Sequence, residues 1–140
     1  MKTIIAALDG SDPALHAATK AAELARALGA RLVLTSVVTP VFIPMEAGAI
    51  DLAAIEDAMA KDAEAQLTKA ATTLQSPGLK IDRKVLRGTT VECLIDLAQK
   101  EQADLVVVGS HGRGAVQRAL LGSVSSRLVH QCPRPVLVVR

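Results

Sequence analysis

The sequence predicts an α/β protein in which a five-stranded parallel sheet is covered by helices in a three-layer α/β/α arrangement. Short apolar segments typical of buried strands alternate with longer segments of helical periodicity along the 140 residues. That alternation favours parallel strands joined by crossover helices. The length fits one domain over residues 1–140, because typical domains hold roughly 100 to 150 residues.

The first strand is expected at Thr3–Leu8, with a helix directly after it. Ser11 or Asp12 can cap this helix and Pro13 suits its first turn. Gly29 suits a left-handed C-cap, which places the end of the helix just before it. The predicted buried stripe of the helix consists of Leu15, Ala18, Ala22, Ala25 and Leu28.

A second buried strand is expected at Arg31–Val38 and is broken by Thr39 and Pro40. The segment Val41–Ile50 has no clear period, and we favour a lid packed on the domain over a dedicated binding surface. A long amphipathic helix follows, ended by residues 75–78. Its predicted apolar stripe consists of Leu52, Ile55, Met59, Ala63, Leu67, Ala70 and Leu74.

A third strand, Lys80–Leu86, carries charges at alternate positions, which indicates an exposed edge of the sheet. Thr89 and Glu92 have the spacing of a capping box for the next helix. The predicted buried stripe of that helix consists of Val91, Leu94, Ile95 and Ala98.

The last third of the chain completes the alternation. A buried strand is expected at Asp104–Val108, a helix at about Ser123–Gln131 and a final strand at Pro135–Val139. The predicted total is therefore five strands and four helices.

Composition argues against several classes of partner. Lys and Arg exceed Asp and Glu by only two, and Phe42 is the single aromatic residue. Base stacking and a polyanion-binding stripe are therefore not expected, and neither is a nucleic-acid partner. The apolar run before Asp9 is too short for a signal peptide or a membrane span, so we expect a cytoplasmic protein without a membrane partner. Cys93 and Cys132 lie far apart without a metal-ligand pattern, which suits a reducing compartment.

The stretch Gly109-Ser110-His111-Gly112, followed after nine intervening residues by Gly122-Ser123, is typical of a phosphate site. Glycine exposes backbone N–H groups, and a helix that begins near Ser123 adds unpaired N–H groups and partial positive charge. Hydroxyls and positive charge at the rim can come from Ser123, Ser125, Ser126, His111, Arg113 and Arg118. The alternative is that these glycines only form a turn and a helix cap.

In sheets of this kind a ligand lies beyond the carboxyl ends of the strands, where the winding reverses direction. Three segments fall at such ends: residues 7–11, 37–40 and 109–112. One pocket is therefore expected to gather all three.

Across its full length the chain resembles the nucleotide-binding branch of the universal stress protein family. The resemblance lies in Asp9-Gly10-Ser11 and in the pattern Gly-x2-Gly-x9-Gly-Ser/Thr, present as Gly109, Gly112 and Gly122-Ser123. The ending Cys-Pro-Arg-Pro-Val-Leu-Val-Val, residues 132–139, is also similar to family sequence.

The resemblance implies a Rossmann-like fold of the adenine nucleotide alpha hydrolase-like type, with strand order 3-2-1-4-5, and a bound ATP with Mg²⁺. It implies that Asp9 approaches the ribose or a phosphate-bound Mg²⁺ and that Val37 meets the adenine, mainly through backbone groups. For each there is an alternative: Asp9 can be a helix cap and Val37 a core residue. The implied nucleotide-binding set is Ala7, Leu8, Asp9, Val37, Val108, Gly109, Gly112, Arg113, Gly122, Ser123, Val124 and Ser125.

Dedicated catalysis is not indicated. The chain lacks the Gly-x4-Gly-Lys-Ser/Thr loop and any Ser-His-Asp or Cys-His nucleophile set, so no catalytic residue is assigned. We expect an ATP-binding sensor or switch in a stress response, with at most slow ATP hydrolysis. The alternative is an interaction module that does not depend on nucleotide. The apolar terminal strand Pro135–Val139 lies at a sheet edge in the implied order, which predicts a homodimer through that strand.

Overall fold

The computed structural model contains all 140 residues and describes every residue except 45, 47 and 112–120. Strands and helices alternate along the chain, as expected from the sequence. In order they are β1 (Thr3–Ala7), α1 (Asp12–Leu28), β2 (Arg31–Val38), α2 (Leu52–Leu74), β3 (Ile81–Arg87), α3 (Thr90–Lys100), β4 (Leu105–Gly109), α4 (Ser123–Gln131) and β5 (Val136–Val139).

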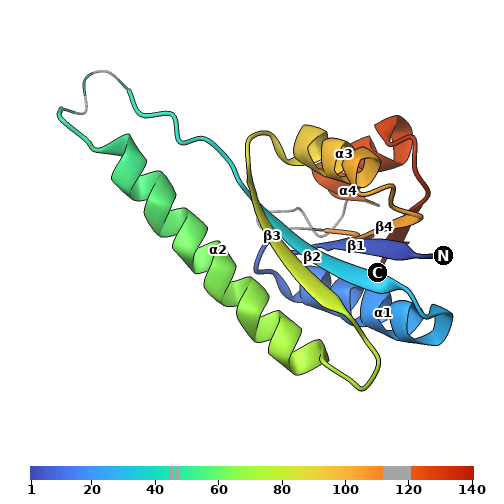
Figure 1. The fold of residues 1–140 in the computed structure, drawn as a ribbon. Coiled ribbons are helices and arrows are strands. Elements are labelled where there is room, and N and C mark those ends of the chain that lie inside the picture. The colour runs from blue at the N-terminus through green and yellow to red at the C-terminus, as the bar shows by residue number, and fades with distance from the viewer. Residues whose placement is uncertain (45, 47, 112–120) are drawn as a thin grey trace.

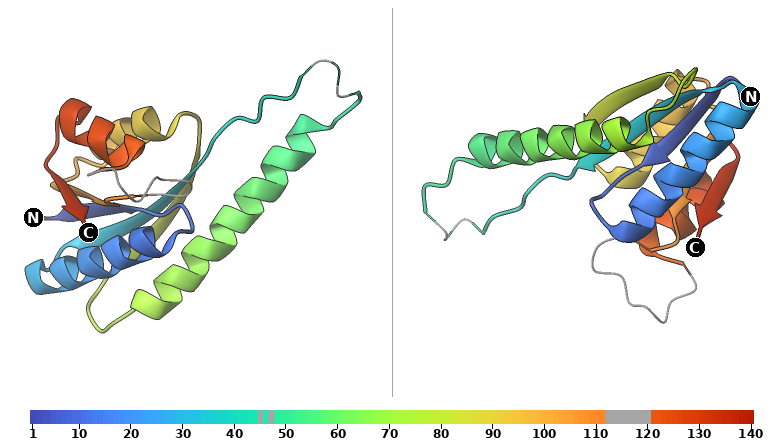
Figure 2. Two further views of the ribbon diagram at one scale, coloured as in Figure 1. Left: turned by 180° about the vertical axis from the view of Figure 1, so that it is seen from behind. Right: turned by 90° about the horizontal axis from the view of Figure 1, so that it is seen from below.

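The five strands form one parallel sheet in the order β3-β2-β1-β4-β5, which confirms the predicted order. Helices α1 and α2 lie on one face and α3 and α4 on the other (Figures 1 and 2). The winding reverses between β1 and β4, so the carboxyl ends of these neighbouring strands open a crevice between the two layers of helices.

Helix α1 packs on the sheet through alanine. Its buried residues are Ala14, Ala17, Ala18, Ala21, Ala22 and Ala25. Leu15 and Leu28, which the predicted stripe included, are 43% and 48% exposed, so that part of the prediction is wrong. Methyl-sized side chains let the helix axis approach the sheet closely, and the larger leucines then lie on the outer flanks of the helix.

Helix α2 packs on the sheet only through its second half, where Ala63, Leu67 and Ala70 are buried. The first half and the preceding segment extend beyond the carboxyl edge of the sheet (Figure 1). Leu52 is accordingly 41% exposed and Phe42 92% exposed. The expected lid over 41–50, packed on the domain, is therefore wrong for the residues that the structure describes, because no sheet lies beneath this part of the chain.

Helix α3 begins without the expected capping box. Thr89 is the N-cap residue, but its side chain makes no capping hydrogen bond. The carboxylate of Glu92 instead accepts a hydrogen bond of 2.8 Å from Arg127 of α4. This contact joins the two helices that cover the same face.

An ion-pair network joins β2, β3 and the end of α3. Arg31 contacts Glu101 at 2.6 Å and Asp82 at 2.8 Å, and Lys84 also donates to Glu101. The Glu101 side chain is only 14% exposed. Hydrogen bonds from Lys84 first and Arg31 second lower the pKa of Glu101 to about 2.

Replacing Glu101 with Gln should lower the free energy of unfolding at pH 7 by about 2 kcal/mol, because two charge-assisted hydrogen bonds are lost. The pKa of Glu101 is lower in the folded state than its ordinary value of 4.5. Its contribution is therefore complete above that value and is lost as the pH falls toward 2. Urea unfolding of both proteins from pH 7 to pH 3 should show the difference shrinking. Asp96→Asn, at an exposed position of α3, is the control, and a difference that does not change with pH would contradict the assignment.

Candidate functional site

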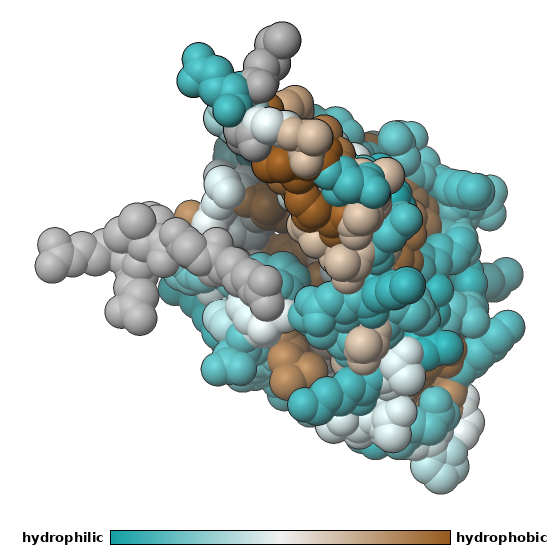
Figure 3. Space-filling model, turned by 90° about the vertical axis from the view of Figure 1, so that its left-hand side faces the viewer, coloured by the Kyte–Doolittle hydropathy of each residue, from teal (hydrophilic) through white to brown (hydrophobic). Residues whose placement is uncertain are grey.

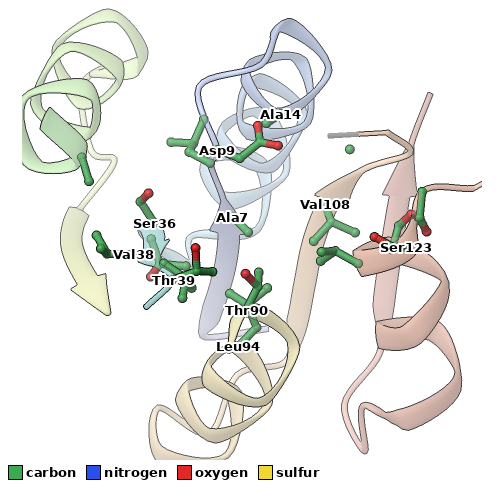
Figure 4. A pocket seen from close by; sticks show the side chains of 18 of the residues that line it. Ala7, Asp9, Ala14, Ser36, Val38, Thr39, Thr90, Leu94, Val108 and Ser123 are labelled. Atoms are coloured by element: carbon green, nitrogen blue, oxygen red, sulfur yellow. Dashed lines mark hydrogen bonds between the residues drawn. The ribbon is translucent and has the colours of Figure 1, made fainter. Parts of the chain in front are cut away.

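A cleft of about 760 Å³ opens at the carboxyl edge of the sheet. Its walls come from the ends of β1, β2 and β4, the first turns of α3 and α4, and one side of α2 (Figure 4). The space-filling view shows a hollow with apolar residues along one side of its rim and hydrophilic residues along another (Figure 3). The volume falls within the roughly 300–1,000 Å³ of small-molecule sites.

The structure brings most of the predicted site residues into this cleft. Gly112 and Arg113 lie outside the described residues, and the role of the whole set in nucleotide binding stays a prediction. The predicted residues that line the cleft are Ala7, Leu8, Asp9, Val37, Val108, Gly109, Gly122, Ser123, Val124 and Ser125.

Sequence reasoning missed two further walls. One comes from the start of α3, with Thr90 and Leu94, and the other from α2, with Met59, Asp62, Ala63 and Gln66. The sequence carried only a weak signal for the α2 wall: the polar residues Asp62 and Gln66 lie next to the stripe positions Ala63 and Leu67. These walls depend on how the helices cross the sheet, which no local motif reports.

Val37 presents unpaired backbone groups to the cleft. Along β2, the carbonyl of Thr35 accepts a hydrogen bond from Leu8 N–H at 2.8 Å, so the N–H and C=O of Val37, two residues further on, also point to the β1 side. Strand β1 ends at Ala7, and no hydrogen bond to these two groups is found in the described part of the chain. The side chain of Val37 packs against the core on the α3 side. The alternative that Val37 is a core residue therefore applies to its side chain but not to its backbone groups.

Asp9 organises the turn between β1 and α1. Its Oδ1 accepts hydrogen bonds from the backbone N–H of Ser11 at 2.9 Å and from the Ser11 hydroxyl at 2.5 Å. Ser11 is itself the N-cap of α1, accepting from Ala14 N–H at 3.3 Å. Gly10 makes the turn possible with a φ of 84°. Asp9 therefore positions the capping residue rather than capping the helix, and its carboxylate lies at the mouth of the cleft.

Gly109 is required by a close approach of α1. A Cβ at this position would lie 2.9 Å from the carbonyl carbon of Pro13 and 3.1 Å from the backbone N of Ala14. The need for glycine here is thus explained by packing between β4 and the first turn of α1. That packing also brings the Asp9 turn next to the end of β4.

The carbonyl of Ser110 joins the end of β4 to the start of α4. It accepts a hydrogen bond from Gly122 N–H at 2.6 Å and another from the Ser125 hydroxyl at 3.0 Å. The side chain of Ser125 is buried, and its oxygen also lies 3.1 Å from the Gly122 carbonyl. Because the single hydroxyl hydrogen is directed at carbonyl groups, Ser125 positions the start of α4, and the donor that it can offer a phosphate is its backbone N–H.

The first turn of α4 faces the cleft without a side-chain cap. Gly122 is the N-cap residue and makes no side-chain hydrogen bond to the turn. The N–H groups of residues 123–125 have no acceptor within the helix, and the N-terminus carries partial positive charge. His111 also lines the cleft, with Nδ1 3.0 Å from the Ser110 hydroxyl.

Among the described residues, no three His, Cys, Asp or Glu side chains gather in a way that would hold a metal ion. Any metal here would take ligands from a bound molecule or from water as well as from the protein. The same part of the chain contains no helix long and apolar enough to cross a membrane.

Comparison with known proteins identifies the family. Residues 1–140 match the model of the universal stress protein family. A universal stress protein of Thermus aquaticus is 38% identical over 140 residues, covering 99% of this chain and 98% of the relative. The universal stress protein UspA from Lactobacillus plantarum superposes with a TM-score of 0.80 at 30% identity, covering 99% of this chain and 97% of that one. A universal stress protein solved in complex with cAMP has a TM-score of 0.70 at 27% identity, covering 99% and 97%.

The chain therefore belongs to the universal stress protein family. The family model covers the strand ends and the start of α4 that form the cleft.

Replacing Ser125 with Ala should lower the free energy of unfolding by about 1–2 kcal/mol, because the buried Ser110 carbonyl loses one of its two donors. Ser123→Ala is the matched control, since Ser123 is exposed, and its cost should stay below about 0.5 kcal/mol. Urea unfolding measures both values. Equal costs for the two variants would contradict a positioning role for Ser125.

Proposed function

We propose that this protein binds ATP with Mg²⁺ in the cleft and acts as a nucleotide-dependent sensor or switch in a stress response. One observation carries the proposal: the uncapped first turn of α4 and the unpaired backbone groups of Val37 line the same cleft. The first suits phosphate and the second suits a base.

The backbone of Val37 matches the polar edge of adenine. A neighbouring N–H and C=O offer one donor and one acceptor. Adenine offers the reverse, a ring nitrogen that accepts next to an amino group that donates. The apolar side chains of Val108 and Val124 line the same space and suit the faces of a base.

The start of α4 suits the phosphates, because its N–H groups and partial charge favour anions. The Asp9 carboxylate suits a ribose hydroxyl or a phosphate-bound Mg²⁺, since carboxylate oxygens are preferred Mg²⁺ ligands. Bound Mg²⁺ would neutralise phosphate charge next to Asp9. The cAMP complex of a relative supports an adenine nucleotide as the ligand class.

A switch is favoured over an enzyme. No lysine or arginine is among the described residues that line the cleft. The Ser110 hydroxyl lies 3.0 Å from His111 Nδ1, but Ser110 does not itself line the cleft, so this contact presents no activated nucleophile to a ligand. The proposal thus includes at most slow hydrolysis, and ATP acts by favouring one of two states of the protein. The second candidate is an interaction module in which the start of α4 serves only as structure.

Isothermal titration of nucleotide-stripped protein with Mg-ATP should show saturable binding at one site per chain. Gly122→Val should abolish it, because a side chain at the N-cap obstructs the N–H groups of residues 123–125. Valine is compatible with the backbone there, at φ −70°, so the fold should persist.

The control is Ala49→Val, at an exposed position before α2 where the backbone φ is not positive. Absence of saturable heat with the unmodified protein would contradict ATP binding. Partner binding and assembly that do not change in Gly122→Val or with nucleotide would favour the interaction module.

We also propose a homodimer through β5, residues Val136–Val139. The carbonyls of Pro135 and Val139 accept hydrogen bonds from β4, so the N–H groups of Val136 and Val138 face the open edge. An apolar open edge is a template for a second strand, and a copy of β5 related by a two-fold axis would cover it.

Val138→Pro should convert the dimer to a folded monomer, because proline removes an N–H that only the partner strand would use. Leu137→Pro is the matched control: it removes an N–H directed at β4 and should destabilise the fold. Light scattering and circular dichroism measure both effects. A monomer mass for the unmodified protein at micromolar concentration would contradict the dimer.

A further inference from the structure

One part of the cleft contains only Leu8 from the predicted nucleotide-binding set. It lies between the end of β2 and the inner side of α2, on the sheet face opposite α3 and α4. We call it the α2 lobe, and the residues that line it are Leu8, Ser36, Met59, Asp62, Ala63 and Gln66.

Side-chain alternation along β2 directs Ser36 into this lobe. Leu34 belongs to the core on the α1 side of the sheet, whereas Val33 and Val37 belong to the core on the α3 side. Ser36 has the parity of Leu34 and so faces α1 and α2. The close-up shows its hydroxyl directed away from Thr90 and Leu94, which approach from α3 (Figure 4).

The Ser36 hydroxyl has no protein partner. The residue is 8% exposed, and no described residue forms a hydrogen bond with its side chain. No polar side-chain atom in the described part is both sealed from solvent and unpaired, so the Ser36 oxygen opens onto the cleft. The neighbouring Thr35 hydroxyl, by contrast, donates to the carbonyl of Lys84 at 2.9 Å. A hydroxyl that opens onto the cleft and has no protein partner there is available both to donate to a bound ligand and to accept from it.

The opposite wall of the α2 lobe is rich in acceptors. The Gln66 side-chain amide donates to the Asp62 carboxylate at 2.9 Å, which turns the amide oxygen of Gln66 and the remaining lone pairs of Asp62 toward other donors. Met59 and Leu8 add apolar surface beside these oxygens. A negative, acceptor-rich lobe disfavours phosphate and favours a group that carries several O–H donors on a carbon frame.

We propose that the α2 lobe binds a neutral polyol, such as a free sugar or the ribose of a nucleotide, through Ser36, Asp62 and Gln66. The carboxylate and the Gln66 oxygen accept from the hydroxyls of the ligand, and Ser36 both donates and accepts. This subsite does not depend on phosphate binding at α4, so it can fail or hold independently of the proposed function.

The test is an amide NMR titration of the full-length protein with D-ribose, first without nucleotide and then with saturating Mg-ATP. Saturable shifts are expected at residue 36 and residues 62–66. The affinity should fall about two- to tenfold in Ser36→Ala, which loses a neutral hydrogen bond, and about tenfold or more in Asp62→Asn, which loses a charge-assisted one. Glu64→Gln, a carboxylate of α2 outside the cleft, should leave it unchanged.

Two results support the subsite and distinguish its source. Ribose shifts that persist with Mg-ATP bound identify a separate sugar, whereas ATP shifts at the same residues that prevent the ribose shifts identify the ribose of the nucleotide. No saturable shift from either ligand, or the same affinity in both cleft variants, overturns the proposal. Shifts at residues 122–125 report the phosphate site separately.

A stability measurement provides a second check. Ser36→Ala should leave the thermal unfolding midpoint unchanged or raise it, because an unpaired hydroxyl is removed. Ser36→Thr keeps the hydroxyl and should retain ribose affinity. A lower midpoint in Ser36→Ala would show that the hydroxyl is already paired within the protein and would overturn the proposal.

Discussion

The carbonyl of Ser110 determines the geometry of the site. It is buried at the end of β4 and accepts hydrogen bonds from Gly122 N–H and the Ser125 hydroxyl, and these bonds fix where α4 begins. The Ser110 N–H in turn bonds to Val139, which ties the same residue to the edge strand β5. The position of the anion-binding turn therefore depends on the sheet itself.

The fold was predictable because its signals are local and repeated. Apolar strands alternate with helices that have clear caps, such as Ser11 and Gly29 at the ends of α1. The errors arose where tertiary packing decides the outcome. The leucines of α1 are displaced by alanines that permit a closer approach, and the segment before α2 has no sheet beneath it.

The candidate site shows the same division. Its glycines and Asp9 were found because backbone turns impose residue types that can be read from the sequence. The sequence did not reveal why two of the site residues are needed. Gly109 accommodates the first turn of α1, and Ser125 uses its hydroxyl in a hydrogen bond within the protein. The α2 wall could not be predicted, because it results from the path of a helix that begins more than ten residues after β2. The backbone groups of Val37 are open because β2 extends beyond β1 at the carboxyl edge of the sheet: the last residue of β1, Ala7, pairs with Thr35.

These features give the cleft two ends of opposite character. Residues 123–125 offer N–H donors and partial positive charge, whereas Asp9 and Asp62 offer carboxylates. A ligand with phosphate at one end and donor groups elsewhere fits this distribution. The crystal structure of the Mg-ATP complex tests the central claim most directly. The account predicts phosphate oxygens on the N–H groups of residues 123–125 and the polar edge of adenine on the Val37 backbone. Nucleotide bound elsewhere, or with its base turned away from Val37, would contradict it.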